Sequence, residues 1–170
     1  MTTLLQLRKR IRTAQNVEQI TKAMEAVAKA QLRTAGRKVE QSARYNDCLS
    51  HMLSRLAGCS ENLTHPFLTQ RELKKIGLLV ITGDKGLSGP YNDTILRAAD
   101  EFLQNPPAAE VELILIGRKA LNHFSKKPWK VRYALENWSG KLTTFMVEKT
   151  AKELTSAYLD NQLDGIWLAY

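Results

Sequence analysis

The chain has 170 residues, of which 44% are hydrophobic, and a formal net charge of +8 at pH 7. This length fits one domain with an extension, and the hydrophobic content allows a sizeable core. No apolar run approaches the roughly 18–20 residues of a membrane span, and the basic cluster Arg8–Arg12 interrupts any signal peptide. We therefore expect a soluble chain, in the cytosol or on the cytosolic face of a larger assembly.

The positive charge is concentrated at the N-terminus. Residues 1–58 carry 11 Lys and Arg against four Asp and Glu, whereas residues 59–170 carry 14 against 13. The basic N-terminal segment indicates an acidic partner, namely nucleic acid, anionic lipid or an acidic protein surface.

A single long helix is predicted from Thr3 to about Ala57, a stretch without proline whose one glycine is Gly36. At about 1.5 Å per residue it would be roughly 80 Å long. Helical periodicity places apolar residues on one side, which we call the apolar seam: Ala14, Val17, Ile20, Met24, Ala28, Leu32, Ala35, Val39 and Ala43. The opposite side, the basic face, carries Arg8, Arg12, Lys22, Lys29, Arg33, Arg37, Arg44 and Arg55.

The apolar seam predicts a coiled coil, because its small side chains allow close packing of a second helix. Its spacing slips in phase between Ala14 and Ile20, which favours a locally irregular supercoil. Nothing later in the sequence is long enough to cover the seam. We expect another chain, or a segment absent from this sequence, to be the partner helix.

Gly58 is expected to end the helix, and residues 59–74 are predicted to form a connector. Cys48 and Cys59 flank this point. Two reduced thiols are the ordinary interpretation, because disulfides are rare in the cytosol. A metal site formed with His51 and His65 is the alternative, but the spacing matches no zinc motif.

Buried strands and helices alternate over residues 75–170. Strands are predicted at 75–82, 111–116, 129–135 and 166–170, and helices at 91–104, 118–126 and 142–161. For the last helix we expect a buried side that includes Leu142, Phe145, Met146, Leu154, Ala157 and Tyr158. The sequence ends directly on the last strand, from which we expect a fragment or a truncated product.

The predicted fold class is therefore α/β. A long coiled-coil helix (1–58) is followed by the connector (59–74) and by a Rossmann-like domain with a mainly parallel sheet (75–170).

A glycine-rich loop, Gly83–Gly89, follows the first predicted strand, where doubly wound folds bind phosphate. It matches neither dinucleotide-binding nor P-loop spacing, and Pro90 removes a helix N–H donor. A tight structural or partner-contacting turn is the favoured interpretation, and nucleotide binding is the alternative.

No catalytic or metal-ligating arrangement is predicted. His123 is expected at or near the surface, and the acidic residues Asp84, Asp93, Glu101, Glu110 and Glu112 are interpreted as solvated charges. The basic face has two interpretations, plain solvation or binding. Its length and the Arg8–Arg12 cluster favour binding. A nucleic-acid interface usually has several aromatic side chains for base stacking, and this helix has one, Tyr45, which argues against nucleic acid as the partner.

Two segments resemble the gamma subunit of F-type ATP synthases. Residues 15–33 contain Ile20-Thr21-Lys22-Ala23-Met24-Glu25-Ala26-Val27-Ala28, similar to the I-T-x-A-M-x-x-V-A motif of that family's N-terminal helix. Residues 84–92, Asp-Lys-Gly-Leu-Ser-Gly-Pro-Tyr-Asn, resemble its D-[RK]-G-L-C-G-x-x-N loop. The resemblance extends in order over the whole sequence.

The resemblance implies a rotor shaft, the central stalk of the F1 head, that couples proton or sodium flow to ATP synthesis and hydrolysis. The implied partners are the alpha and beta subunits, whose beta surfaces are acidic, together with epsilon and the membrane rotor c-ring. It implies no cofactor, no nucleic acid and no catalytic residue in this subunit. The implied location is peripheral, on the cytoplasmic face of the bacterial inner membrane.

Carried over by position, the resemblance implies two sets of functional residues. The partner-contacting residues, toward the alpha–beta head and the paired helix, are Arg8, Lys9, Arg10, Arg12, Ile20, Lys22, Ala23, Met24 and Val27. The residues of the structural loop are Gly86, Leu87 and Gly89.

Three departures from the family stand out. Ser88 replaces the usual Cys, and Pro90 replaces the usual Gly. The family's antiparallel C-terminal helix is missing from the sequence. The sequence is therefore expected to be a fragment, a truncated product or a degenerate gamma subunit. The alternatives are a basic coiled-coil adaptor for nucleic acid or anionic membrane, and a small nucleotide-binding Rossmann protein.

Overall fold

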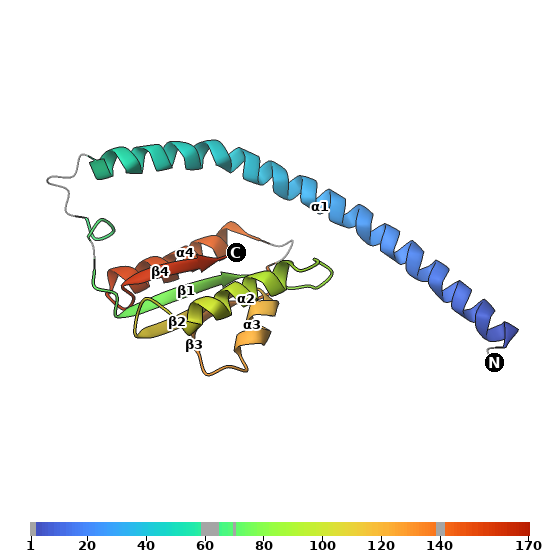
Figure 1. The fold of residues 1–170 in the computed structure, drawn as a ribbon. Helices are drawn as coiled ribbons and strands as arrows, with labels where there is room; N and C mark the ends of the chain where they lie inside the picture. The colour runs from blue at the N-terminus through green and yellow to red at the C-terminus, as the bar shows by residue number, and fades with distance from the viewer. Residues whose placement is uncertain (1–2, 59–64, 70, 139–141) are drawn as a thin grey trace. The chain divides into compact units, whose positions relative to one another are not determined.

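The computed structural model describes residues 3–58, 65–69, 71–138 and 142–170 (Figure 1). The chain forms two compact units, Met1–Leu63 and Thr64–Tyr170. Cys59 and part of the predicted connector lie outside the described residues.

The first unit consists of one helix, α1 (Leu4–Gly58, 55 residues), as predicted. Its start is stabilised by Gln6, whose side-chain oxygen accepts a hydrogen bond from the backbone N–H of Thr3 at 3.1 Å. In return the Thr3 carbonyl accepts from the N–H groups of Gln6 and Leu7. This reciprocal arrangement satisfies groups that a helix end leaves unpaired.

The second unit is a four-stranded parallel sheet with the strand order β3-β2-β1-β4. The strands are β1 (Lys75–Ile81), β2 (Glu110–Ile116), β3 (Lys130–Leu135) and β4 (Gly165–Ala169). The helices between them are α2 (Tyr91–Gln104), α3 (Arg118–Phe124) and α4 (Thr144–Leu159). The α/β fold class and the parallel sheet are confirmed.

Each face of the sheet has its own core. Alternate residues of β1 and β2, such as Leu78 and Leu113, pack with Ile95 of α2 and Phe124 of α3. The intervening residues, such as Leu79 and Ile114, pack with Ala157 in the last turns of α4 and with Leu163 in the turn that follows it. The two middle strands are therefore buried on both faces, which explains their continuous apolar sequences.

The predicted buried side of the last helix (142–161) is wrong at its N-terminal end, where Leu142 even lies outside α4. Leu142 and Phe145 are 50% and 71% exposed, while Ala157 is 1% exposed. The burial comes from the second half of the helix, where Leu154 and Ala157 reach the core that Leu79 and Ile114 form. The helix also starts later than predicted, because the Thr143 side chain accepts from the Met146 N–H and caps it.

Candidate functional site

Helix α1 presents its side chains to solvent along its described length. Every described side chain of this helix is exposed, including Leu32 at 73% and Val39 at 67%. An isolated amphipathic helix derives little stability from its own hydrogen bonds, because most helical stability in proteins comes from packing of the apolar face. The helix is thus built to contact something along its length.

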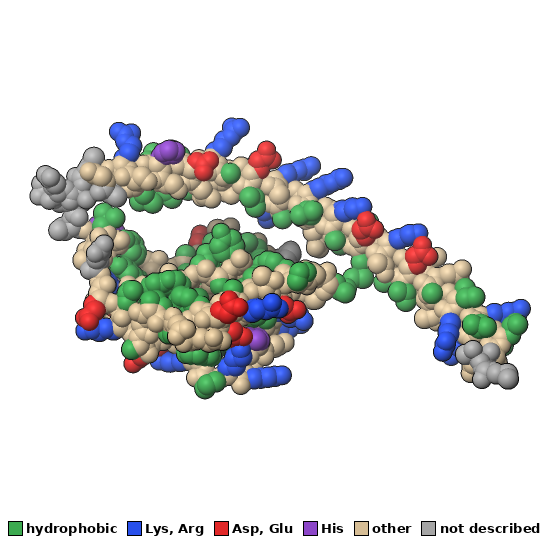
Figure 2. Space-filling view, viewed as in Figure 1, with side chains coloured by type: hydrophobic (Ala, Val, Ile, Leu, Met, Phe, Trp, Pro, Cys, Tyr) green, Lys and Arg blue, Asp and Glu red, His purple; other side chains and the backbone are tan. Residues whose placement is uncertain are grey.

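Polar and apolar side chains are separated around α1. Over the middle of the helix, Figure 2 shows mainly Lys and Arg side chains along one edge and hydrophobic side chains along the other, whereas Lys and Arg lie on both sides at its N-terminal end. On the basic face, Lys22 pairs with Glu18 at 2.7 Å and Lys29 with Glu25 at 2.6 Å, both one turn apart and exposed. The other basic residues of the described helix form no ion pair within it and are available to an acidic partner.

The candidate residues of the family motif share one face of α1. Ile20, Ala23, Met24 and Val27 follow the spacing i, i+3, i+4, i+7, and all four are exposed. Four residues with this spacing form the hole that receives one side chain of a partner helix in a coiled coil. Lys22 lies on the basic face beside them.

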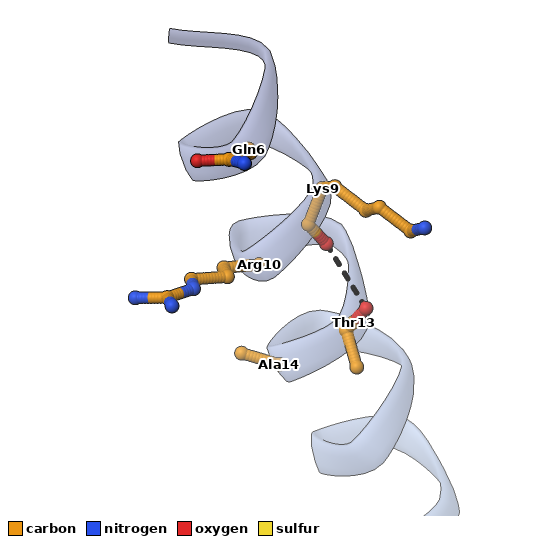
Figure 3. A pocket seen from close by; sticks show the side chains of 5 residues that line it. All are labelled: Gln6, Lys9, Arg10, Thr13 and Ala14. Atoms are coloured by element: carbon orange, nitrogen blue, oxygen red, sulfur yellow. Dashed lines mark hydrogen bonds between the residues drawn. The ribbon is translucent and has the colours of Figure 1, made fainter. Parts of the chain in front are cut away.

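The N-terminal end of α1 carries a hollow lined by Gln6, Lys9, Arg10, Thr13 and Ala14 (Figure 3). All five come from one helix with the same three- and four-residue spacing, and the hollow is open to solvent. The Thr13 hydroxyl donates to the Lys9 carbonyl at 3.0 Å, so its methyl group remains for packing. Two cationic side chains at a helical hollow suit a partner helix with an acidic flank.

The candidate loop after β1 is held together from within. The Gly83 N–H donates to the Asn92 side-chain oxygen at 2.9 Å, and the Asn92 amide donates to the Ser88 hydroxyl at 2.8 Å. Asn92 is 6% exposed. Pro90 occupies the N-cap position of α2 without a side-chain cap. The Gly83 N–H is thus engaged and Pro90 has no N–H, so two of the backbone donors that a phosphate could use are missing. This favours the structural interpretation of the loop over nucleotide binding.

The loop residues that resemble the family motif lie at its exposed tip. Leu87 has a φ of 62° and is 91% exposed, and Gly89 has a φ of 59°. Left-handed backbone is ordinary for glycine but costs a leucine roughly 1–2 kcal/mol. Gly86 is also exposed.

Asp84 is a structural residue that the sequence analysis misinterpreted as a solvated charge. It is 7% exposed, and its Oδ1 accepts from the backbone N–H groups of Arg118 at 3.1 Å and Asn137 at 2.9 Å. It therefore joins the loops that follow β1, β2 and β3 at the carboxyl edge of the sheet. The pairing is non-local, so no pattern near residue 84 could indicate it.

Glu112 is the second acidic residue misinterpreted as solvated. It is 2% exposed, and its carboxylate pairs with Lys75 at 2.9 Å, Lys130 at 2.6 Å and Arg132 at 2.9 Å. Burial alone would raise the pKa of Glu112, but hydrogen bonds from these three cations outweigh it and lower the pKa to about 2. A glutamate inside the strand sequence Val-Glu-Leu-Ile-Leu-Ile was the available signal.

A third cluster connects α2 and α3. Asp100 accepts from Lys127 Nζ at 2.6 Å and lies 2.8 Å from His123 Nε2. Burial would raise the pKa of Asp100, but the bonds to Lys127 and His123 lower it overall. The cluster lies at the surface, with each of its three side chains about one third exposed.

The described part of the chain contains no group of three or more His, Cys, Asp or Glu residues placed to hold a metal ion. Within it no helix has the length and apolar character to cross a bilayer. Cys48 is an exposed free thiol on α1.

Comparison with known proteins identifies relatives over the whole sequence. The family model described as ATP synthase matches residues 3–170. The ATP synthase gamma chain of Protochlamydia amoebophila is 43% identical over 170 residues, which are 100% of this chain and 60% of that protein. That of Heliobacterium modesticaldum is 32% identical over 164 residues, covering 96% and 56%.

The chain thus spans 56–60% of the length of these two relatives. Among solved structures, the central stalk and c-ring of the Tetrahymena thermophila mitochondrial ATP synthase contain a chain with a similar fold. The TM-score is 0.60 at 23% identity, over 81% of this chain and 59% of that one.

Proposed function

The chain belongs to the ATP synthase gamma family, and we propose that it serves as the central rotor shaft of an F-type ATP synthase. One observation carries the proposal. The 55-residue helix α1 is exposed throughout, with an apolar seam on one side and a basic face on the other. Such a helix suits a shaft that packs on a second helix and slides against a charged surface.

The proposed partner of the apolar seam is the C-terminal helix of the gamma family, packed antiparallel on α1. The holes formed by Ile20, Ala23, Met24 and Val27 would receive its side chains and those of the surrounding head. The basic face, with Lys22, and the cluster Arg8, Lys9, Arg10 and Arg12 would face acidic surfaces of the beta subunits.

The proposed mechanism is mechanical coupling without chemistry in this chain. Because the helix is asymmetric around its axis, its rotation would present different faces to each alpha–beta pair in turn. Each alpha–beta pair would then favour a different conformation. A binding partner shifts a conformational equilibrium only when it contacts one conformation better than the other, and each face of the helix would do so differently. ATP synthesis and hydrolysis would take place in the head, coupled to a proton or sodium current.

The α/β domain is proposed to lie below the head, near epsilon and the c-ring, on the cytoplasmic side of a bacterial inner membrane. Gly86, Leu87 and Gly89 would shape the exposed loop tip on this domain. The internal hydrogen bonds of Gly83, Ser88 and Asn92 support a structural loop rather than a nucleotide site.

Reconstitution tests the proposal. Membrane vesicles whose ATP synthase lacks gamma would receive this chain together with a separately supplied C-terminal gamma helix. The proposal expects ATP-driven proton or sodium pumping to return, and not to return with the helix alone. ATP hydrolysis without any restored pumping would contradict it.

A further inference from the structure

The described residues of the connector are attached to the end of α4 by an aromatic and cationic contact. The Phe67 ring stacks on the Tyr158 ring with centroids 5.3 Å apart, and the Arg71 guanidinium carbon lies 4.0 Å from the centre of the Tyr158 ring. The Tyr158 hydroxyl donates to the Pro66 carbonyl at 3.3 Å. Tyr158 thus touches three positions of the chain that leads from α1 into the domain.

Arg71 also binds the backbone at the end of α4. Its Nη1 donates to the Tyr158 carbonyl at 2.7 Å. Tyr158 lies in the last turn of the helix, whose carbonyl groups carry partial negative charge, and its carbonyl also accepts from the Asn161 N–H at 3.2 Å. The Arg71 guanidinium bonds this carbonyl and also stacks on the Tyr158 ring. The two contacts together hold the guanidinium in one orientation.

A second attachment lies where the connector enters β1, at Lys74 and Lys75. Asp164 Oδ2 accepts from the backbone N–H groups of Lys74 at 3.0 Å and Lys75 at 2.8 Å, and the Asp164 N–H donates to the Lys75 carbonyl at 2.8 Å. The bonds from Lys75 and Lys74 lower the pKa of Asp164, so it is ionised at neutral pH.

Both attachment points are fixed to the domain core. The turn between them is closed by the N–H groups of Gln162 and Leu163, which both donate to the Ala157 carbonyl at 2.9 Å. Leu163 is fully buried and packs with Ala157 and Ile114. Tyr158 and Asp164 therefore cannot move without disturbing the α4 face of the sheet.

This arrangement has a mechanical consequence. Residues 59–74 are the covalent link from α1 to the domain, and they lead directly into β1, a middle strand of the sheet. Without attachment, a force on α1 would act on the first residue of β1. With it, the force is divided among β1, the end of α4 and the start of β4.

We propose that Arg71, Tyr158 and Asp164 form a clamp through which torque on α1 enters the α/β domain. This inference rests on the proposed rotor function. It assigns the three side chains a positioning role, since they contact neither nucleotide nor ion.

The test compares the clamp variant Arg71→Gln/Tyr158→Leu with the conservative Tyr158→Phe, which keeps the ring and loses the bond to Pro66. Tyr170→Leu is the matched control, because Tyr170 is 80% exposed and takes no part in the contacts of Arg71, Tyr158 and Asp164 described above. Hydrogen exchange on the isolated chain measures the amides of residues 65–75. Vesicles reconstituted with the same chains and the C-terminal gamma helix give the ratio of ions pumped to ATP hydrolysed.

The clamp variant should exchange these amides roughly tenfold faster, because charge-assisted and ring contacts that hold the segment are lost. Its pumping ratio should fall several-fold while hydrolysis and complex yield stay at the wild-type level, and the other two variants should match the wild type. A purely structural role would leave that ratio unchanged.

Unchanged exchange, or faster exchange with an unchanged pumping ratio, would overturn the clamp while leaving the rotor function intact. Failure of the wild-type chain to restore pumping would instead overturn the rotor function, and the mechanical role of the clamp with it.

Discussion

Gly117 lies directly against Thr82: a Cβ atom at position 117 would stand 2.1 Å from the Thr82 carbonyl oxygen. Gly117 has a φ of 100°, a backbone conformation that residues other than glycine rarely adopt. Thr82 is fully buried, and its hydroxyl accepts from the Ala120 N–H at 2.9 Å. The two residues join the ends of β1 and β2, beside the candidate loop.

Replacing Gly117 with alanine should destabilise the α/β domain strongly. The change forces both a backbone clash and an unfavourable φ, for which we expect a loss of about 3 kcal/mol or more in the free energy of unfolding. Urea denaturation followed by tryptophan fluorescence measures this loss. Gly36→Ala is the matched control, because nothing lies within 4 Å of a Cβ there. Alanine there favours the α1 helix by about 0.5–1 kcal/mol, but α1 belongs to the other unit, so the unfolding of the α/β domain followed by its tryptophans should not change. An equal loss in both variants would refute the explanation.

Glu112→Gln should also destabilise the domain. It leaves Lys75, Lys130 and Arg132 without their common counter-charge, and removing one partner of a buried ion pair costs about 3–5 kcal/mol. Glu110→Gln on the same strand changes a side chain that is 71% exposed and 3.9 Å from Lys75, so we expect less than about 1 kcal/mol. Chemical denaturation at neutral pH measures the free energy of unfolding of both variants. If the two variants lost the same amount, the buried carboxylate of Glu112 would stabilise the domain no more than the exposed carboxylate of Glu110.

The same carboxylate predicts acid sensitivity. The pKa of Glu112 is about 2 in the folded chain against an ordinary value of 4.5. A lowered folded pKa gives stability that is complete above the unfolded pKa and is lost as the pH falls toward the folded one. The stability of the wild type should thus decline from about pH 4.5 downward, by up to about 3 kcal/mol from this group. Glu112→Gln should show a shallower decline over this range, and a parallel one would contradict the assignment.

Met24→Lys should damage coupling. Met24 is 48% exposed on the apolar seam, and a charge there would be buried against the partner helix or the head. The measurement is ATP-driven pumping in the reconstituted complex. Ala26→Lys places the same charge among the basic residues of α1, where an acidic partner surface would accept it, and should reduce pumping much less than Met24→Lys. Unchanged pumping in the Met24 variant would count against the seam as a contact surface.

The sequence predicts the elements of this fold well because each depends on local patterns. The long helical periodicity of α1 and the apolar runs of β1 and β2 carry enough signal without any neighbour. Asp84 and Glu112 were misinterpreted because their burial depends on residues 20 to 53 positions away, such as Arg132 and Asn137. The contacts of Tyr158 with Phe67 and Arg71 are equally non-local.

The apolar side of α4 also shows that a sequence pattern does not predict burial by itself. Leu142 and Phe145 fit a helical apolar pattern with Leu154 and Ala157, yet only the later residues reach the sheet. Periodicity indicates which side of a helix is apolar. It does not indicate over how much of its length the helix meets a neighbour. The partner-contacting residues of α1 also remain predictions, since a surface by itself does not identify what binds it.

Co-purification with ATP synthase alpha and beta subunits tests the rotor account most directly. The chain would be expressed with both subunits, with and without a separately supplied C-terminal gamma helix, and the complex isolated through a tag on beta. The account predicts a stable complex of all the chains when the helix is present and little or none without it, because the apolar seam then lacks its cover. A chain that never joins the head, and instead binds random DNA or anionic vesicles with an affinity that falls steeply with salt, would contradict it.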